Sequence, residues 1–441
     1  MRTLQNSGWL KNYLRFRLNH PFPPLRAYLE SPHPLTARHD FDKCLYHVVQ
    51  ENGVLLGCPV VAPGMTSQWK ECGFPEKYAD VIFVYLETLF SVAIQEKKLL
   101  NPEQTNDAKL LKQVVLDVIY FYLKQDVADN FKNEELYFML SSNKNFLKSL
   151  TLMEKEINRQ IKVKKMFSSS GHLQNLFGFL EIYYFLQWHF AYHVQRNESD
   201  SLLHSFLERQ IQLKEQLILM FSALVWADEV VMPVEAQVMQ QYIDQARLPL
   251  KILRKFQKRI RTPVLLEDLS FSIESDLLKK YLLQTLILLS LIDNQQAPQE
   301  DDLILKIAMR MEVGKEELDL LYMAVIEFFA EHGHNFNVLT NNPAVSKLDQ
   351  YVRAKIMVAV QSSLENIMTE IRETGELSVL LAKATSQPLT DEEKRKVKEQ
   401  LMDIAKTVPA LAIFCLPAGG IVLAVLIKLL PFKILPSAFN E

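Results

Sequence analysis

The chain has 441 residues, a net charge of −3, and 49% hydrophobic and 23% charged residues. This length exceeds that of one ordinary hydrophobic core, so we expect two or three domains. The small net charge excludes a general electrostatic attraction to nucleic acid, and no DNA partner is expected. Only 12 glycines occur, beside long stretches rich in Leu, Gln, Glu and Lys, and this composition predicts an all-α fold of multi-helix bundles.

The N-terminal region, residues 1–200, is predicted to be helical but of unknown type. Its first residues hold no apolar run of signal-peptide length, because Lys11, Arg15 and Arg17 interrupt it. Repeated prolines predict that residues 20–75 are rich in loops. Apolar residues at three- and four-residue steps then predict four helices, over 77–100, 107–127, 133–165 and 171–195.

Two histidines, His189 and His193, lie one helical turn apart in the last of these ranges. That spacing can hold zinc, but no Glu occupies the HExxH position and no third ligand is apparent. We therefore expect packed or surface histidines. The four cysteines form no CxxC pair and no metal-ligand spacing, which fits a reducing compartment.

An internal repeat follows. Each copy has an apolar helix, a turn that opens with Asp, a Pro that starts the next helix, and a Glu two positions after the Pro. The two sets are Asp228, Pro233 and Glu235, and Asp293, Pro298 and Glu300. Pro suits the first helical turn, where no backbone N–H is needed, and the Glu lies at the positive end of the helix dipole.

These paired units resemble the TerB (tellurite-resistance B) family, and we assign residues 205–335 to a TerB-like helical domain. The stretch "MEVGKEELDLL" at 311–321 is similar to the end of that family's domain. The resemblance implies a compact helical bundle that binds metal through acidic residues. The candidate oxygen ligands for Mg²⁺ or Ca²⁺ are Asp228, Glu235, Asp293 and Glu300. Turn and cap chemistry would select the same residue types, so both interpretations stay open.

Between the repeat copies, "KILRKFQKRIR" at 251–261 predicts a helix with basic residues along one side and apolar residues on the other. The basic residues are Lys251, Arg254, Lys255, Lys258 and Arg259. They form either an ordinary solvated face or a patch for anionic lipid head groups or ribosomal RNA phosphates. Because no aromatic residues accompany the basic face, lipid is the better functional candidate.

Residues 343–406 are predicted to form a long helical stalk or hairpin. An apolar stripe over 345–371 predicts a helix, and we expect the chain to bend over 374–390. The sequence "TDEE" at Thr390–Glu393 predicts a capping box that starts a charged helix.

The end of the chain is strongly apolar, with no charge in the twenty residues from Val408 to Ile427. This is the length that a helix needs to cross a bilayer, and we expect one transmembrane segment over 408–430. A re-entrant hairpin broken at Pro417–Gly420 and a buried core helix are the alternatives. Lysine and arginine are more frequent before this segment than after it, so the large N-terminal part is predicted to be cytoplasmic.

The order of prolines in this segment resembles the transmembrane segment of the Letm family of mitochondrial inner-membrane proteins. The matching features are Pro409, Pro417, "KLLP" at 428–431 and "LPSAF" at 435–439, the last two of which contain Pro431 and Pro436 within a short Letm-like tail, 431–441. The resemblance implies a role in cation and proton exchange and, more weakly, ribosome binding. A ribosome-binding-like domain follows the segment in that family, and no residues here match it.

We therefore predict a single-pass protein of the bacterial inner membrane that contributes to cation and proton homeostasis. Because one span cannot enclose a pathway, copies would assemble in the bilayer, with Pro417, Gly419 and Gly420 allowing close packing and Lys428 reaching the interface. The alternative is a membrane-tethered binding module for ribosome or envelope-stress partners. No Gly-rich phosphate loop, nucleophile elbow or catalytic triad is found, so we do not expect an enzyme.

Overall fold

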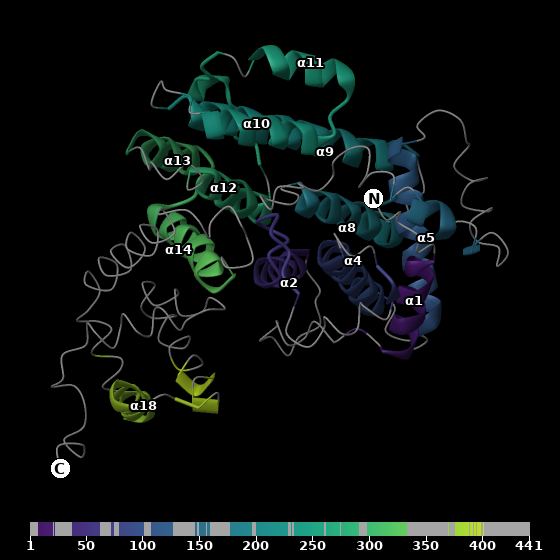
Figure 1. The fold of residues 1–441 in the computed structure, drawn as a ribbon, viewed down its shortest axis with the longest axis horizontal. Helices are drawn as coiled ribbons and strands as arrows, with labels where there is room; N and C mark the ends of the chain where they lie inside the picture. Colours follow the sequence, from purple (N-terminus) through teal and green to yellow (C-terminus); the bar gives the residue numbers. More distant parts are fainter. Residues whose placement is uncertain are drawn as a thin grey trace. The chain divides into compact units, whose positions relative to one another are not determined.

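The fold is known from a computed structural model of the chain. It describes residues 8–20, 22, 38–61, 72–74, 79–100, 107–126, 146–147, 150–155, 157–158, 177–195, 200–227, 231, 233–259, 262–273, 275–290, 298–332, 369, 375–387, 389–390, 392–393, 395–397 and 400. Every regular element among these residues is helical, which confirms the predicted all-α class (Figure 1). The chain divides into two compact units, residues 1–270 and 271–441.

The first unit is a bundle built around α8. Its helices are α1 (Trp9–Asn19), α2 (Arg38–Glu51), α4 (Ala79–Leu100), α5 (Asp107–Asp126), α8 (Gly178–Gln195), α9 (Asp200–Val225), α10 (Pro233–Ala246) and α11 (Leu250–Arg259). Helix α8 packs against α4, α5 and α9, and α4 also packs against α5 (Figure 1). Most of the described side chains of α8 are buried, because apolar residues occur on all sides of this helix.

Most helices of this unit follow the predicted periodicity. Helices α4 and α5 confirm the predictions over 77–100 and 107–127, and α8 confirms the later part of 171–195. Much of 133–165 lies outside the described residues. The loop-rich prediction for 20–75 is wrong over α2, because the prolines of that region stop at Pro34 and resume only at Pro59.

Helix α1 is held to the bundle by aromatic and ionic contacts. Trp9 and Tyr13 are fully buried, and their rings contact Phe74. Arg17 forms a two-pronged ion pair with Glu87 of α4, in which Arg17 Nε donates to Glu87 Oε1 at 2.7 Å. Tyr13 Oη donates to the same oxygen at 2.7 Å. Burial raises the pKa of the Glu87 carboxyl, although the Arg17 charge opposes this effect.

The start of α1 is capped from a distant part of the chain. The Glu154 carboxylate accepts hydrogen bonds from the backbone N–H of Gly8 at 2.6 Å and of Leu10 at 3.1 Å. These are N–H groups that the first helical turn leaves without intrahelical partners. Glu154 thus fixes the position of α1 through both charge and hydrogen bonding.

The second unit contains α12 (Asp276–Ser290), α13 (Pro298–Arg310), α14 (Lys315–His332) and α18 (Gly375–Ser386). Helices α12, α13 and α14 pack against one another (Figure 1). The predicted bend over 374–390 is wrong over most of its length, because α18 occupies it. The capping box is confirmed, since Thr390 N donates to Glu393 Oε2 at 2.9 Å and Glu393 N to Thr390 Oγ1 at 3.3 Å.

The described helices leave the predicted membrane segment untested. None of them combines the length and the apolar composition that crossing a bilayer requires. The predicted span over 408–430 and the tail 431–441, with all their candidate residues, lie outside the described residues, and so does the apolar stripe over 345–371 except for residue 369.

Candidate functional site: a buried histidine and carboxylate cluster

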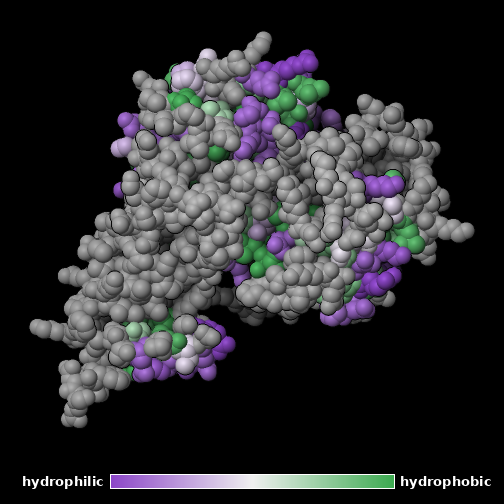
Figure 2. Space-filling model, in the orientation of Figure 1, coloured by the Kyte–Doolittle hydropathy of each residue, from purple (hydrophilic) through white to green (hydrophobic). Residues whose placement is uncertain are grey.

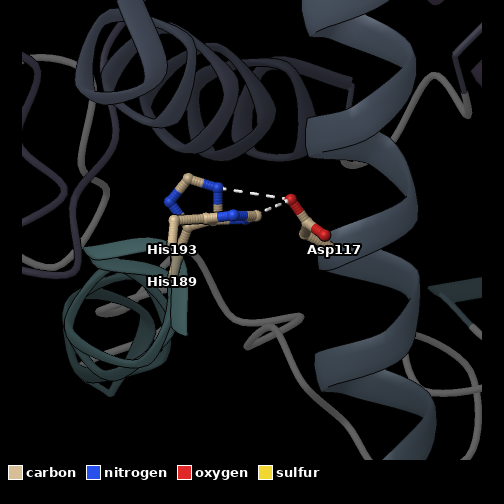
Figure 3. Close-up of side chains that lie close together, drawn as sticks. All are labelled: Asp117, His189 and His193. Atoms are coloured by element: carbon tan, nitrogen blue, oxygen red, sulfur yellow. Dashed lines mark hydrogen bonds and ion pairs between the residues drawn. The ribbon is translucent and has the colours of Figure 1, made fainter. Parts of the chain in front are cut away.

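Five ionisable side chains meet inside the first unit, where α4, α5 and α8 pack together. They are Glu96 and Lys97 of α4, Asp117 of α5, and His189 and His193 of α8, and we call them the buried cluster. His189 and His193 project from the same side of α8 because four residues nearly complete one helical turn. Figure 3 shows both rings directed at the Asp117 carboxylate, which reaches them from the neighbouring helix.

The contacts converge on one oxygen of Asp117. Its Oδ2 lies 3.0 Å from His193 Nε2, 3.4 Å from His189 Nε2 and 2.8 Å from Lys97 Nζ. On its other nitrogen, His189 Nδ1 lies 2.5 Å from Glu96 Oε2. The two imidazole rings are in contact, with centroids 4.5 Å apart.

Almost all of this cluster is shielded from water. The side chains of Asp117 and His189 have no exposed surface, and those of Glu96 and Lys97 are 2% and 6% exposed. His193 is the most open member, with 23% of its side chain exposed. Charges buried to this degree are costly unless they are paired, so the five groups depend on one another.

Burial and pairing act in opposite directions on the protonation of these groups. Burial would raise the pKa of Asp117, but the two histidine rings that face its carboxylate and the nearby Lys97 charge lower it below its usual range. Burial would lower the pKa of His189, but the neighbouring carboxylates of Asp117 and Glu96 raise it. For His193, burial dominates and the pKa is lowered. Because the pKa of Asp117 is lowered, this residue is held as the carboxylate at neutral pH.

Two polar atoms of the cluster are buried and make no hydrogen bond in the described part of the chain. They are Asp117 Oδ1 and His189 Nε2, the second of which faces Asp117 at a distance too long for a good bond. Buried polar atoms in native proteins are nearly always satisfied, so each such atom calls for a physical explanation. Both atoms belong to residue types that bind metal ions.

The structure changes the interpretation of the histidine pair. From the sequence alone the pair had no third ligand, whereas Asp117 supplies a carboxylate oxygen next to both Nε2 atoms. One ligand atom from each of the three residues lies within 4.8 Å of the others. Asp117 lies 76 positions before His193, so no local motif joins them. The available signal was a single Asp in the apolar run "VVLDVIYFYL" of a predicted helix.

Two of the four predicted oxygen ligands of the repeat lie among the described residues. Helices α10 and α13 begin at Pro233 and Pro298, which confirms the predicted helix starts. Glu235 is half-buried and Glu300 is buried in the first turns of these helices, which lie in different units. Asp228 and Asp293 lie outside the described residues. Their metal-binding role stays a prediction.

The predicted basic helix is confirmed as α11. Lys251, Arg254 and Lys255 are exposed, whereas Phe256 on the opposite side is buried. The side chains of Lys258 and Arg259 lie outside the described set. Figure 2 shows hydrophilic residues gathered at the top of the view, where α11 lies in Figure 1. Leu250 adds an exposed apolar side chain, 71% accessible, at the start of this helix.

A second buried ion pair joins α8 to α9. Lys214 Nζ donates to Glu181 Oε1 at 2.7 Å, and both side chains are at most 10% exposed. Burial would raise the pKa of Glu181, but the charges of Lys214 and Arg247 lower it below its ordinary value. This pair fixes the end of α8 that lies away from the histidines.

The lowered pKa of Glu181 predicts a stability contribution that depends on pH. A carboxyl with a depressed folded-state pKa stabilises the fold above its unfolded pKa of about 4.3, and this contribution is lost as the pH falls through the folded value. Replacing Glu181 with Gln should cost about 3 kcal/mol at pH 7, because Lys214 stays buried without its counter-ion. We expect this cost to shrink below about pH 4.

Chemical denaturation followed by tryptophan fluorescence measures this difference, because all four tryptophans, Trp9, Trp69, Trp188 and Trp226, lie in the first unit. The matched control is Glu208→Gln on α9, whose side chain is 60% exposed. A cost for Glu181→Gln that stays constant from pH 7 to pH 3 would contradict the assignment.

The chain was compared with known proteins at three levels. It matches no protein-family model, no curated protein and no solved structure.

Proposed function

We propose that this protein is a membrane-tethered helical protein that binds cations and contributes to cation and proton homeostasis at a bacterial inner membrane. We propose a binding role rather than a catalytic one, with the large helical part in the cytoplasm. The observation that carries the cation part is the buried cluster, in which two carboxylates, a lysine and two histidines meet in a water-shielded interior.

Hydrophobic packing does not account for this cluster, because apolar side chains of similar volume would stabilise the bundle at least as well. Buried, paired titratable groups of this kind are concentrated at functional sites. The cluster also lies among three packed helices rather than in a loop, so its geometry is fixed by the fold. These features support a binding role for the first unit.

The membrane part of the proposal is supported by the uncharged run from Val408 to Ile427 and by the order of its prolines. The exposed basic side chains of α11 offer a second, weaker attraction to anionic lipid head groups. A chain with both features would hold its helical part close to the bilayer surface, and copies would assemble through Pro417, Gly419 and Gly420.

Carbonate extraction at alkaline pH tests the tether. We expect the full chain to stay in the membrane pellet and a chain that ends at Thr407 to be released completely, because a spanning segment resists removal of peripheral contacts. The control is a full-length chain with Lys251, Arg254 and Lys255 replaced by Gln, which should stay in the pellet. Release of the full-length chain would overturn the tether.

A second candidate is a tethered binding module that transports nothing, with a ribosome or an envelope-stress protein as its partner. The exposed Leu250 beside the basic side of α11 favours it, because such a surface suits docking to an anionic partner. Replacing residues 408–441 with an unrelated anchor separates the two. A binding module would keep its function in this chimera, whereas a protein that takes part in ion flux would lose it. Ion flux should also be lost in Pro417→Ala and Gly420→Leu chains that still insert into the membrane.

A further inference from the structure

We propose that Asp117, His189 and His193 bind one divalent transition-metal ion of the zinc class, with a fourth coordination position open to a small ligand. This inference rests on the proposed cation role of the buried cluster and names the kind of cation. Its tests use metal binding to the protein and do not depend on membrane attachment.

The spacing of the three ligand atoms fits a small coordination sphere. Two ligand atoms at about 2.0–2.1 Å from a tetrahedral zinc ion lie about 3.3 Å from each other. Asp117 Oδ2 lies 3.0 Å from His193 Nε2 and 3.4 Å from His189 Nε2. The separation expected around a tetrahedral zinc ion lies between these two distances. One ligand atom from each of the three residues lies within 4.8 Å of the others, so the two imidazole nitrogens must move closer together to share one ion.

Glu96 places His189 in the orientation that a ligand needs. Its carboxylate lies 2.5 Å from His189 Nδ1, which therefore carries the ring proton and directs Nε2 at Asp117. A histidine that binds metal almost always donates its other ring N–H to a carboxylate, a carbonyl or water in this way. The same arrangement explains why the buried Nε2 makes no hydrogen bond of its own in the described structure.

Lys97 shares the Asp117 carboxylate with the proposed metal ion. Lys97 Nζ contacts Oδ2, the oxygen that faces the histidines, while Oδ1 is buried without a partner among the described residues. A metal ion on Oδ2 would compete with the Lys97 ammonium for this oxygen, and Oδ1 would remain free for Lys97. Lys97 is therefore a competitor of the ion and neither holds nor orients its ligands.

The ligand set selects the class of metal. Two imidazole nitrogens and one carboxylate oxygen suit Zn²⁺ or Fe²⁺, whereas Mg²⁺ and Ca²⁺ prefer oxygen ligands alone. Three protein ligands leave a fourth position for water or a small anion. His193 is the only one of the three whose side chain reaches solvent, so it marks the entry path for the ion.

The test is zinc binding to the purified full-length chain, prepared without a histidine tag and stripped with a chelator. Equilibrium dialysis is expected to give one tightly bound Zn²⁺ per chain, and Co²⁺ in its place should give the visible absorption of a four-coordinate site with nitrogen and oxygen ligands. His189→Gln, His193→Gln and Asp117→Asn should each weaken binding by at least about 100-fold, and Glu96→Gln by about 10–100-fold.

Two variants serve as controls. His204→Gln removes an exposed histidine on α9, 73% accessible, and should bind zinc as the unchanged chain does. Lys97→Met removes the ammonium that shares Asp117. We expect it to keep or tighten zinc binding, and zinc should raise its melting temperature at least as much as that of the unchanged chain.

Several outcomes would overturn the site. The unchanged chain and Lys97→Met could both fail to retain zinc, which would leave the cluster a structural ion network. Equal zinc binding by His193→Gln, which changes a partly exposed side chain and should fold, would also exclude it. A thiolate absorption band with Co²⁺ would assign the ion to cysteine instead. None of these results affects the carbonate extraction, which tests the tether separately.

Discussion

Replacing Asp117 with Ala is expected to lower the free energy of unfolding of the first unit by about 3–5 kcal/mol. Lys97, His189 and His193 all direct a nitrogen at this carboxylate. Without the Asp117 carboxylate, the Lys97 ammonium remains buried and has lost its counter-ion on α5. Chemical denaturation in the presence of a chelator, followed by tryptophan fluorescence, measures the loss without a contribution from bound metal.

The matched control is Asp244→Ala on α10, where the carboxylate is exposed and its bond is a local one to Gln240. Its effect should stay within about 0.5 kcal/mol. A double-mutant cycle sharpens the test. Lys97→Met combined with Asp117→Leu should cost clearly less than the two single changes together, because neither charge is left alone. Simple additivity would show that the two groups do not depend on each other.

Replacing Arg17 with Met is expected to cost a similar amount, about 3–5 kcal/mol. Arg17 is 4% exposed and forms both prongs of its ion pair with Glu87, so Met would leave a buried carboxylate with Tyr13 as its main donor. Burial already raises the pKa of Glu87, and loss of the Arg17 charge removes the main opposing effect. The same fluorescence-monitored denaturation measures the change.

Arg15→Met is the control for this change, because Arg15 is an exposed arginine on the same helix. It should alter the free energy of unfolding by no more than about 0.5 kcal/mol. Equal losses for Arg15→Met and Arg17→Met would show that the effect comes from the general properties of α1 rather than from the ion pair.

Local rules predicted much of the fold. The apolar periodicity gave α4 and α5 nearly to the residue, and the proline of each repeat copy marked the first residue of α10 or α13. The capping box at Thr390–Glu393 needs only four neighbouring residues, and its two hydrogen bonds are present. These features depend on chain-local sterics and hydrogen bonding, which a sequence displays directly.

The buried cluster could not be predicted in the same way. It depends on which face of α5 meets α8, and this is decided by packing between helices that are distant in sequence. Sequence reasoning found His189 and His193 but assigned the metal role to the acidic residues of the repeat, which the TerB resemblance suggested. The sequence shows the lone Asp117 inside an apolar run, but it does not show that this carboxylate lies next to the two histidines.

The measurement that tests the account most directly is X-ray absorption at the zinc edge on the full-length protein loaded with one equivalent of Zn²⁺. The account predicts nitrogen and oxygen neighbours at about 2.0–2.1 Å, with the outer-shell scattering of two imidazole rings. In His189→Gln this imidazole signal should fall by half. Sulfur neighbours at about 2.3 Å, or zinc that washes out before measurement, would contradict the assignment of Asp117, His189 and His193 as the metal site.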